Sequence, residues 1–230
     1  ATPYASGLST LVEDETELGV ACVDMGGGTT TLSVFVEGQM VHLDAIAVGG
    51  HHVTMDIARA LSTRLADAER IKTLQGSALP SHSDERDFIS VPPVDADSDL
   101  PIQVPRSTLV RVIVPRVEEI LELVRDRLTA SGFAGRVGKR IVLTGGASQL
   151  TGLSDVARRV LGRQVRLGRP LGIAGLPEAA KGPAFAAAVG LLIYPQVAQV
   201  EQFEPRNLRG RWNLGSGALA RVGNWIRESF

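Results

Sequence analysis

Val23-Asp24-Met25-Gly26-Gly27-Gly28-Thr29-Thr30 is the stretch that decides the fold: the end of an apolar run, followed by three glycines and two threonines. The run from Leu18 to Asp24 predicts a short buried strand that enters a tight turn. A phosphate tail needs converging backbone N–H donors with no side chains in the way, and glycines after a strand supply that geometry. The stretch therefore predicts a phosphate-binding loop, with an ordinary glycine turn as the alternative.

A second glycine loop, Thr144-Gly145-Gly146-Ala147-Ser148, follows another apolar strand and precedes a short helix. Two such units in one chain favour nucleotide contact at the carboxyl edge of a sheet. Neither loop carries the Walker lysine or the dinucleotide fingerprint. We expect both loops to form part of an ATP-binding cleft. The residues expected to hold the nucleotide are Asp24, Gly26, Gly27, Gly28, Thr29, Thr30, Gly145, Gly146 and Ser148, and Asp24 is also expected to hold Mg²⁺ through water.

The rest of the chain alternates between strand-like and helical patterns, which predicts an α/β fold. Strands are expected at 31–37 and 40–47, joined by a turn at Gly38-Gln39, and at 88–91, 102–104, 140–143 and 164–167. Helices are expected at 53–68, 105–129, 153–161 and 183–194. Pro115 is expected to kink the second of these helices or to end its first part.

The composition excludes several classes of protein. The 24 Lys and Arg nearly balance the 25 Asp and Glu, which argues against a nucleic-acid partner. The single cysteine, Cys22, excludes an internal disulfide framework and is expected to be a small buried apolar residue. His51-His52 is not expected to bind a metal, because neighbouring residues point to different faces of a helix or strand.

The two loops resemble motifs of the actin/Hsp70/sugar-kinase superfamily. Val23 to Thr30 is similar to its second phosphate motif, and Ile141 to Leu153 is similar to its adenosine motif. Between them, Ala68-Glu69-Arg70-Ile71-Lys72 resembles the helix whose Glu and Lys reach the ribose and the adenine. The resemblance implies that Glu69 and Lys72 line the nucleoside pocket. From the residues alone, an i,i+3 ion pair on a solvated helix face is favoured.

Within the superfamily, the chain resembles the C-terminal half of the FtsA family of bacterial cell-division proteins. The stretches that carry this likeness are Ala5 to Leu8, Glu15 to Gly19, Gly49 to Ala58 and Val114 to Leu121. The first lobe, with its own phosphate loop and the 1C subdomain, is absent from the chain. FtsA proteins commonly have Asp where this chain has Thr31, and a longer linker before their terminal helix.

The resemblance implies an actin-like, ribonuclease H-like α/β lobe with an inserted smaller α/β subdomain and a C-terminal amphipathic helix. The expected division is 1–52 (first part of subdomain 2A), 53–139 (subdomain 2B), 140–195 (second part of 2A), 196–215 (linker) and 216–230 (helix). In the family, 2B binds the acidic, partly apolar C-terminal tail of FtsZ, which makes Arg116 a candidate contact. An ion pair of Arg116 with Glu119 on its own helix is the equal alternative.

The C-terminal segment from Ser216 to Phe230 has the pattern of a membrane-interface helix. Advancing 100° per residue places its large apolar residues in one arc of about 140°, and the other side carries Arg221, Asn224, Arg227 and Glu228. A Trp- and Phe-bearing face opposed by arginines is typical of a helix that lies on anionic lipid. The alternative is a helix that docks on the domain or on a partner. The residues expected to enter the membrane are Leu219, Val222, Trp225, Ile226 and Phe230.

Three functions compete at this point. The first is an ATP-binding membrane tether that forms actin-like filaments, docks FtsZ and other divisome proteins, and acts at the division site on the cytoplasmic face of the bacterial membrane. The second is a phosphotransferase of the same superfamily, and the third is a pilus-assembly relative of the PilM type. The terminal helix favours the tether. No catalytic residue is assigned, and the sequence leaves open whether the chain hydrolyses ATP.

Overall fold

The computed structural model describes residues 2–94, 100–171 and 173–197. The predicted terminal helix, and the predicted linker from residue 198 onward, lie outside the described residues. The chain up to Tyr194 forms one compact unit. No described helix is long and apolar enough to cross a membrane.

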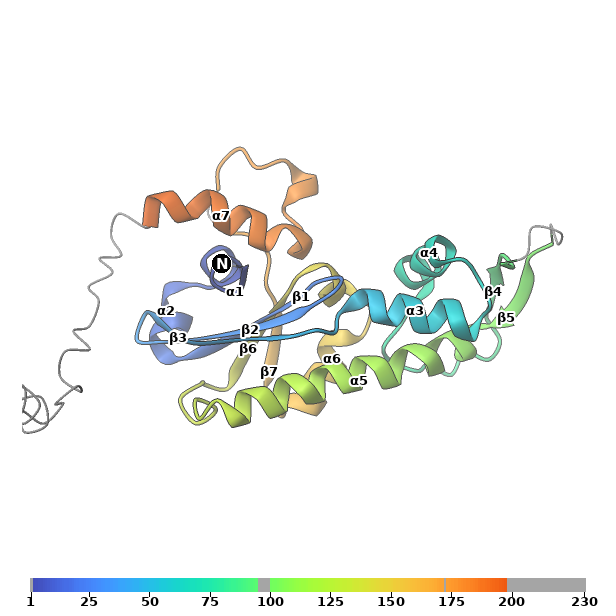
Figure 1. Ribbon diagram of the computed structural model, residues 1–230, viewed down its shortest axis with the longest axis horizontal. Coiled ribbons are helices and arrows are strands. Elements are labelled where there is room, and N and C mark those ends of the chain that lie inside the picture. The colour runs from blue at the N-terminus through green and yellow to red at the C-terminus, as the bar shows by residue number, and fades with distance from the viewer. Residues whose placement is uncertain (1, 95–99, 172, 198–230) are drawn as a thin grey trace, which may run out of the picture. The chain divides into compact units, whose positions relative to one another are not determined.

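A five-stranded sheet forms the centre of this unit (Figure 1). Its strands run in the order β3-β2-β1-β6-β7, and they are β1 (Val20–Met25), β2 (Thr30–Val36), β3 (Gln39–Ile46), β6 (Arg140–Thr144) and β7 (Gln164–Leu167). The first three form an antiparallel meander, whereas β6 and β7 run parallel to β1. Asp24 lies opposite Thr144 in the parallel pair, so both glycine loops leave the sheet at one edge.

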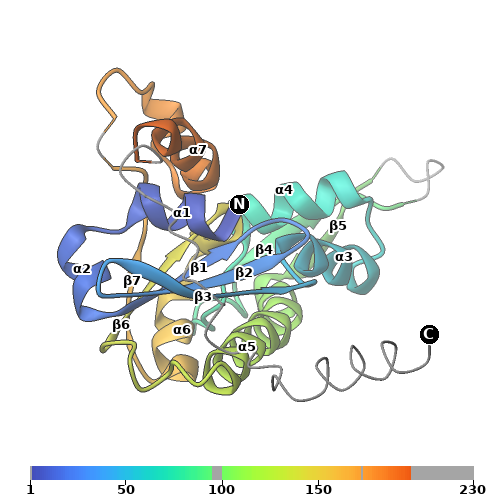
Figure 2. The same ribbon diagram turned by 60° about the vertical axis from the view of Figure 1, so that its left-hand side comes forward.

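Helices cover both faces of the sheet, which explains why every residue of β1 is buried (Figure 2). On one face, α1 (Thr2–Thr10) packs across β1 and β2, and α2 (Glu13–Leu18) follows it. On the other face lie α5 (Arg106–Ala130) and α6 (Leu153–Leu161). Side chains along a strand alternate between faces: Val20 packs with Tyr4 and Leu11 on the α1 side, whereas Ala21 and Val23 belong to the larger core that includes α5.

Small residues let α1 lie close to its neighbours. A Cβ on Gly7 would lie 2.5 Å from the ring of Phe35 on β2, and a Cβ on Gly190 of α7 (Ala186–Val197) would lie 1.8 Å from the carbonyl oxygen of Ala5. The predicted helix at 183–194 begins with a 3₁₀ turn, η3 (Pro183–Phe185), and η2 (Glu178–Ala180) precedes it. The helices α1 and α2 were not predicted from the sequence.

The segment between β3 and β6 contains α3 (Gly50–Ala60), α4 (Leu65–Gln75) and the hairpin of β4 (Phe88–Val91) and β5 (Ile102–Pro105). The predicted single helix at 53–68 is wrong. Ser62 adopts φ +48°, and the hydroxyl of Thr63 donates to the carbonyl of Pro92 at 2.6 Å, so the chain turns between two helices. Because α3 begins at Gly50, the predicted boundary between residues 52 and 53 falls within a helix.

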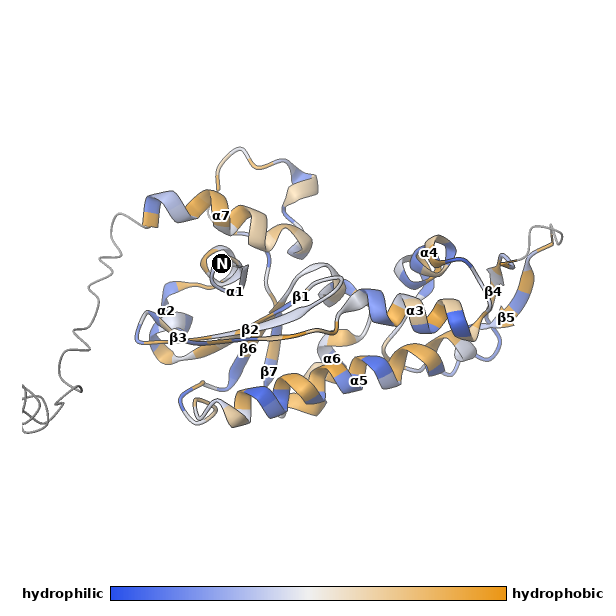
Figure 3. Cartoon of the chain, viewed as in Figure 1, coloured by the Kyte–Doolittle hydropathy of each residue, from blue (hydrophilic) through white to orange (hydrophobic). Residues whose placement is uncertain are grey.

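The long helix α5 continues through Pro115, so the expectation that Pro115 ends its first part is wrong. Pro115 is exposed, and the buried stripe continues on the opposite side, visible as orange segments in Figure 3. That stripe consists of Leu109, Val110, Ile113, Val117, Ile120, Leu121, Val124 and Leu128. The hairpin turn after β2 also shifts by one residue: Glu37 and Gly38 both have positive φ, which is the geometry of a type I′ turn.

Candidate nucleotide site

The two glycine loops touch where β1 and β6 end. Gly145 has φ +86°, and a Cβ on this residue would lie 2.3 Å from Oδ1 of Asp24 and 2.5 Å from the carbonyl oxygen of Met25. Only glycine fits this position without displacing the neighbouring strand. The parallel pairing of β1 with β6 therefore brings the predicted residues Asp24 and Gly145 together.

The start of α3 holds the first glycine loop through two backbone hydrogen bonds. The N–H of Gly50 donates to the carbonyl of Gly26 at 2.9 Å, and the N–H of His51 donates to the carbonyl of Gly27 at 2.8 Å. A Cβ on Gly49 would lie 2.6 Å from the carbonyl oxygen of Gly26. Gly49 and Gly50 thus fix the loop, a role that was not predicted from the sequence. Two adjacent glycines at the start of a helix are the sequence feature from which it could have been predicted.

The first glycine loop exposes the backbone N–H groups of Gly27 and Gly28. Gly27 and Gly28 are exposed, and a Cβ on either would meet nothing within 4 Å. Within the described ranges, their backbone N–H groups have no hydrogen-bond acceptor. Since the carbonyls of Gly26 and Gly27 are tied to α3, the N–H groups can face a ligand, which is the arrangement that a phosphate group needs.

Asp24 is buried at the end of β1 and accepts a hydrogen bond from the hydroxyl of Ser6 on α1. Burial raises the pKa of the Asp24 carboxyl, and the Ser6 hydrogen bond only partly counters this effect. The sequence reading missed Ser6, although it lies in the quoted stretch Ala5 to Leu8. A serine 18 residues before the carboxylate gives no local signal, because α1 meets β1 only in the folded chain.

Ser6→Ala is expected to lower the free energy of unfolding by about 1–2 kcal/mol at neutral pH, because a buried carboxylate loses a donor. Since the folded-state pKa of Asp24 is already raised, the variant should raise it further. The cost should therefore shrink as the pH falls through this pKa. Urea unfolding across a range of pH measures it, and a cost that grows on acidification would contradict the assignment.

Lys72 joins α4 to the same region. Its ammonium donates to Oε2 of Glu69 at 2.7 Å, to Oγ1 of Thr54 at 2.8 Å and to the carbonyl of Gly50 at 3.1 Å. Burial raises the pKa of Glu69, but hydrogen bonds from Lys72 and Thr54 outweigh it and hold this pKa below its usual value. The i,i+3 pair is present. Lys72 contacts Gly50, which supports the phosphate loop, directly, and Glu69 is linked to Gly50 through Lys72 and through Thr54.

The hydroxyl groups near the loops are engaged within the chain. Thr30 donates to the carbonyl of Val48 at 2.8 Å. Ser148, which lies in η1 (Gly146–Gln149), donates to the carbonyl of Gly145, the residue that precedes η1, at 2.7 Å. Thr29, in contrast, is exposed beside the open donors. The structure therefore presents backbone N–H groups and Thr29 at the surface of the site, and it uses Thr30 and Ser148 to hold the two loops.

The residues present fit a bound nucleotide phosphate. Gly27 and Gly28 provide an open cradle of N–H donors, and Lys72 lies beside the supporting helix. Among the described residues, no three His, Cys, Asp or Glu side chains gather as a metal site. A magnesium ion held from Asp24 would therefore take most of its ligands from phosphate and water, as Mg²⁺ commonly does.

Arg116 on α5 forms ion pairs with two carboxylates. Nε and Nη2 donate to Asp56 on α3 at 2.6 and 3.2 Å, and Nη1 donates to Glu119 at 2.5 Å. Hydrogen bonding to Asp56 is the main cause that raises the pKa of Arg116. Both contacts are intramolecular, and the partner role of Arg116 stays a prediction. The residues predicted to enter a membrane lie outside the described residues.

The prediction that Cys22 is a small buried residue is confirmed. Its side chain is 1% exposed, and burial raises the pKa of the thiol to about 12, so the unreactive protonated form persists at neutral pH.

Comparisons with solved structures identify the fold. Spiroplasma citri MreB5 bound to ADP superposes with a TM-score of 0.68 over 87% of this chain and 61% of its own, at 18% sequence identity. A PilM-PilN type IV pilus biogenesis complex gives a TM-score of 0.62 over 84% of this chain and 51% of its own, at 20% identity. The predicted actin-like α/β fold is confirmed by this likeness, which at such low identity shows the fold alone.

Sequence comparison gives the family. The family model described as cell division protein FtsA matches residues 21–190. The cell division protein FtsA of Rhizobium meliloti (strain 1021) is 62% identical over 231 residues, which cover 100% of this chain and 52% of the relative. The chain spans about half the length of the curated relatives it matches. With the two glycine loops joined at one sheet edge and this identity along its whole length, the chain belongs to the FtsA family of cell-division proteins.

Proposed function

We propose that the chain is the nucleotide-binding and membrane-attached half of a protein that tethers the FtsZ ring to the cytoplasmic face of the bacterial membrane at the division site. The observation that carries the nucleotide part is the contact of Gly145 with Asp24, which joins the two loops beside the open donors of Gly27 and Gly28. Bound ATP with Mg²⁺ would supply negatively charged phosphate groups that both this lobe and a second lobe could contact. In this chain, Gly27 and Gly28 bind phosphate, and Glu69 and Lys72 face the nucleoside.

The tethering part rests on the sequence of the C-terminal segment. Trp225, Ile226 and Phe230 share one face of the predicted helix, opposite Asn224 and Arg227. Burial of such a face in a lipid interface is favourable, and each nearby arginine adds about 1 kcal/mol on anionic lipid. Docking of the FtsZ C-terminal tail on 2B, self-association into filaments and contacts with other divisome proteins complete the proposal. The likeness to the PilM-PilN complex is one of fold alone, and no feature of the described residues favours the phosphotransferase alternative.

Co-sedimentation with vesicles tests the tether. The chain should pellet with phosphatidylcholine vesicles that contain about one third phosphatidylglycerol, through its apolar face and its arginines. Trp225→Glu should weaken this binding at least roughly tenfold, because it removes a large apolar side chain and buries a charge.

Asn224→Glu is the matched control, because it adds the same charge on the polar face of the predicted helix. It should weaken binding much less than Trp225→Glu. Equal pelleting of the original chain and of Trp225→Glu would count against the membrane role.

A further inference from the structure

The segment that follows α4 is buried against the long helix α5. Residues 76–79, called the strap below, leave α4 at Gly76. A Cβ on Gly76 would lie 3.1 Å from Cδ1 of Ile113 on α5, and both Ser77 and Ala78 are buried. The strap is therefore part of the packed interior rather than a surface connection.

The strap also contacts the residues that follow the second glycine loop. The N–H of Ala78 donates to the carbonyl of Thr151 at 2.8 Å, and Ser77 forms a parallel β-bridge with Thr151. Gly152 has φ +77°, and a Cβ on it would lie 2.7 Å from Cγ of Leu79. Only glycine lets the Leu79 side chain lie this close to the backbone. One backbone hydrogen bond and one close packing contact thus join the strap to this part of the chain.

The strap connects two segments of the candidate nucleotide site. The helix α4, which carries Glu69 and Lys72, leads directly into it. The second glycine loop is held at its start by the contact of Gly145 with Asp24, and the strap holds the chain just after the loop. Because both segments end at the strap, the strap fixes the spacing between α4 and the loop.

We propose that Ala78 and Leu79 are positioning residues for the nucleoside, and that they hold the second glycine loop at the distance from α4 that a base and ribose require. This inference rests on the proposed nucleotide binding and adds how the nucleoside part of the site is held. The first glycine loop is held separately, by the start of α3. A change in the strap should therefore weaken nucleoside binding and leave phosphate binding at Gly27 and Gly28 intact.

Preorganisation is the physical reason for this effect. A pocket that already has its binding geometry loses little free energy in becoming ordered when the ligand arrives. Loosening the contacts that support the pocket adds that loss to the binding free energy. The coupling is reciprocal, so a bound nucleoside should stabilise the closed strap.

Gly152→Ala and Gly162→Ala form a matched pair of variants. Both replace a glycine of positive φ at an end of α6. A new Cβ at position 152 meets Leu79, whereas one at position 162 meets nothing within 4 Å among the described residues. NMR titrations with ADP and, separately, with inorganic pyrophosphate measure the two parts of the site. Gly152→Ala should weaken ADP binding roughly three- to tenfold and leave pyrophosphate binding unchanged, and Gly162→Ala should change neither.

Leu79→Ala tests the same contact from the other side. It should also weaken ADP binding and spare pyrophosphate binding, because it removes the side chain that packs on Gly152. Since it makes room for the new Cβ of Gly152→Ala, the double variant should lose less affinity than the two single losses multiplied together. Losses that multiply would show that the two positions act separately and would overturn the contact as the cause.

Hydrogen exchange of the Ala78 amide gives a direct readout in the original chain. ADP should slow this exchange and pyrophosphate should not, because only ADP carries the nucleoside. An exchange rate that ADP leaves unchanged would overturn the inference. Equal losses of ADP and pyrophosphate binding in Leu79→Ala, or no loss of either, would also overturn it and leave nucleotide binding standing. A chain that binds neither probe overturns both the inference and the proposed nucleotide binding.

Discussion

Gly145→Ala is expected to lower the free energy of unfolding by about 3 kcal/mol. Two costs combine at this residue: a non-glycine residue at φ +86° loses about 1 kcal/mol, and overpacking adds about 1–3 kcal/mol. The clash cannot relax easily, because the new Cβ meets Oδ1 of Asp24 at 2.3 Å and the backbone of Met25 at 2.5 Å, at the end of the central strand.

Gly162→Ala separates these two costs. Gly162 also has a positive φ, +62°, but a Cβ there would meet nothing within 4 Å. It should therefore lose only the conformational term of about 1 kcal/mol. Guanidinium unfolding of both variants measures their losses in free energy of unfolding. The difference between the two losses is the cost of the steric clash between the two glycine loops. Equal losses would show that the two loops do not touch in solution.

The sequence predicted the sheet and the loops well, because their signals are local. The apolar run before Asp24 and the one before Thr144 each specify a strand, and glycines after a strand specify the loop. The pattern also predicted α5, since its eight buried residues recur at helical spacing. The C-terminal helix stays a prediction.

The missed features depend on contacts between distant segments. Ser6 reaches Asp24 only because α1 crosses the sheet, and Lys72 reaches Gly50 only because α4 folds back on α3. The break between α3 and α4 went unseen because Leu65 continues the apolar spacing, although it is 51% exposed. Hydrophobic periodicity cannot detect a turn that a buried Thr63 hydroxyl stabilises through Pro92.

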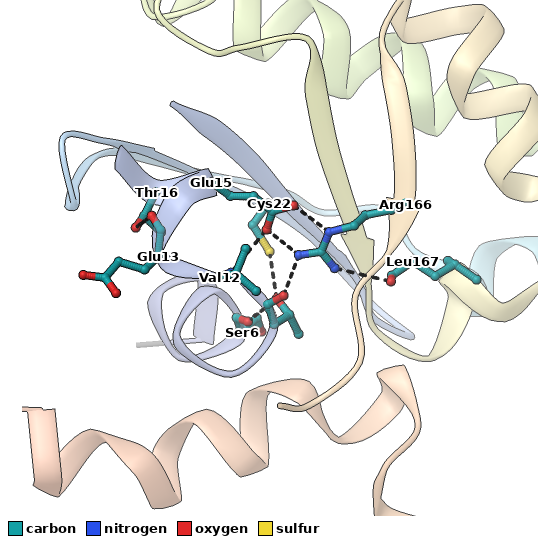
Figure 4. Close-up of polar contacts among 9 residues, drawn as sticks. Ser6, Val12, Glu13, Glu15, Thr16, Cys22, Arg166 and Leu167 are labelled. Carbon is teal, nitrogen blue, oxygen red and sulfur yellow. Dashed lines mark hydrogen bonds and ion pairs between the residues drawn. The ribbon is translucent and has the colours of Figure 1, made fainter. Parts of the chain in front are cut away.

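Arg166 holds the N-terminal helices to the sheet through Glu15, and the close-up in Figure 4 shows the guanidinium between β7 and the chain of α1 and α2. Nε donates to Oε1 of Glu15 at 2.7 Å, and Nη2 donates to Oε2 of Glu15 at 2.5 Å and to the carbonyl of Thr10 at 2.7 Å. The side chain of Glu15 is 7% exposed and that of Arg166 is 33% exposed. This geometry leaves little room for water to replace either partner.

Arg166→Ala is expected to lower the free energy of unfolding by about 3 kcal/mol at neutral pH, because it leaves a buried carboxylate without its counter-charge. This loss lies at the low end of the range for broken buried ion pairs, since a third of the Arg166 side chain is exposed. Adding Glu15→Gln to Arg166→Ala removes the stranded charge, so the double variant should be more stable than Arg166→Ala alone. A double variant that is less stable would contradict this account of the pair.

The pH dependence of the same variant gives an independent check with a definite sign. Burial alone would raise the pKa of Glu15, but the Arg166 hydrogen bond, the Val12 N–H and the nearby positive charge hold it below 4.5. The pair therefore stabilises the fold above the unfolded pKa, and this contribution is lost as the pH falls through the lower folded pKa. In Arg166→Ala, burial still raises the pKa of Glu15, so protonation of Glu15 removes the unpaired buried charge.

The difference in free energy of unfolding between the original chain and Arg166→Ala should narrow as urea unfolding is repeated from about pH 7 towards about pH 4. A difference that stays constant would show that Arg166 acts by packing rather than by charge.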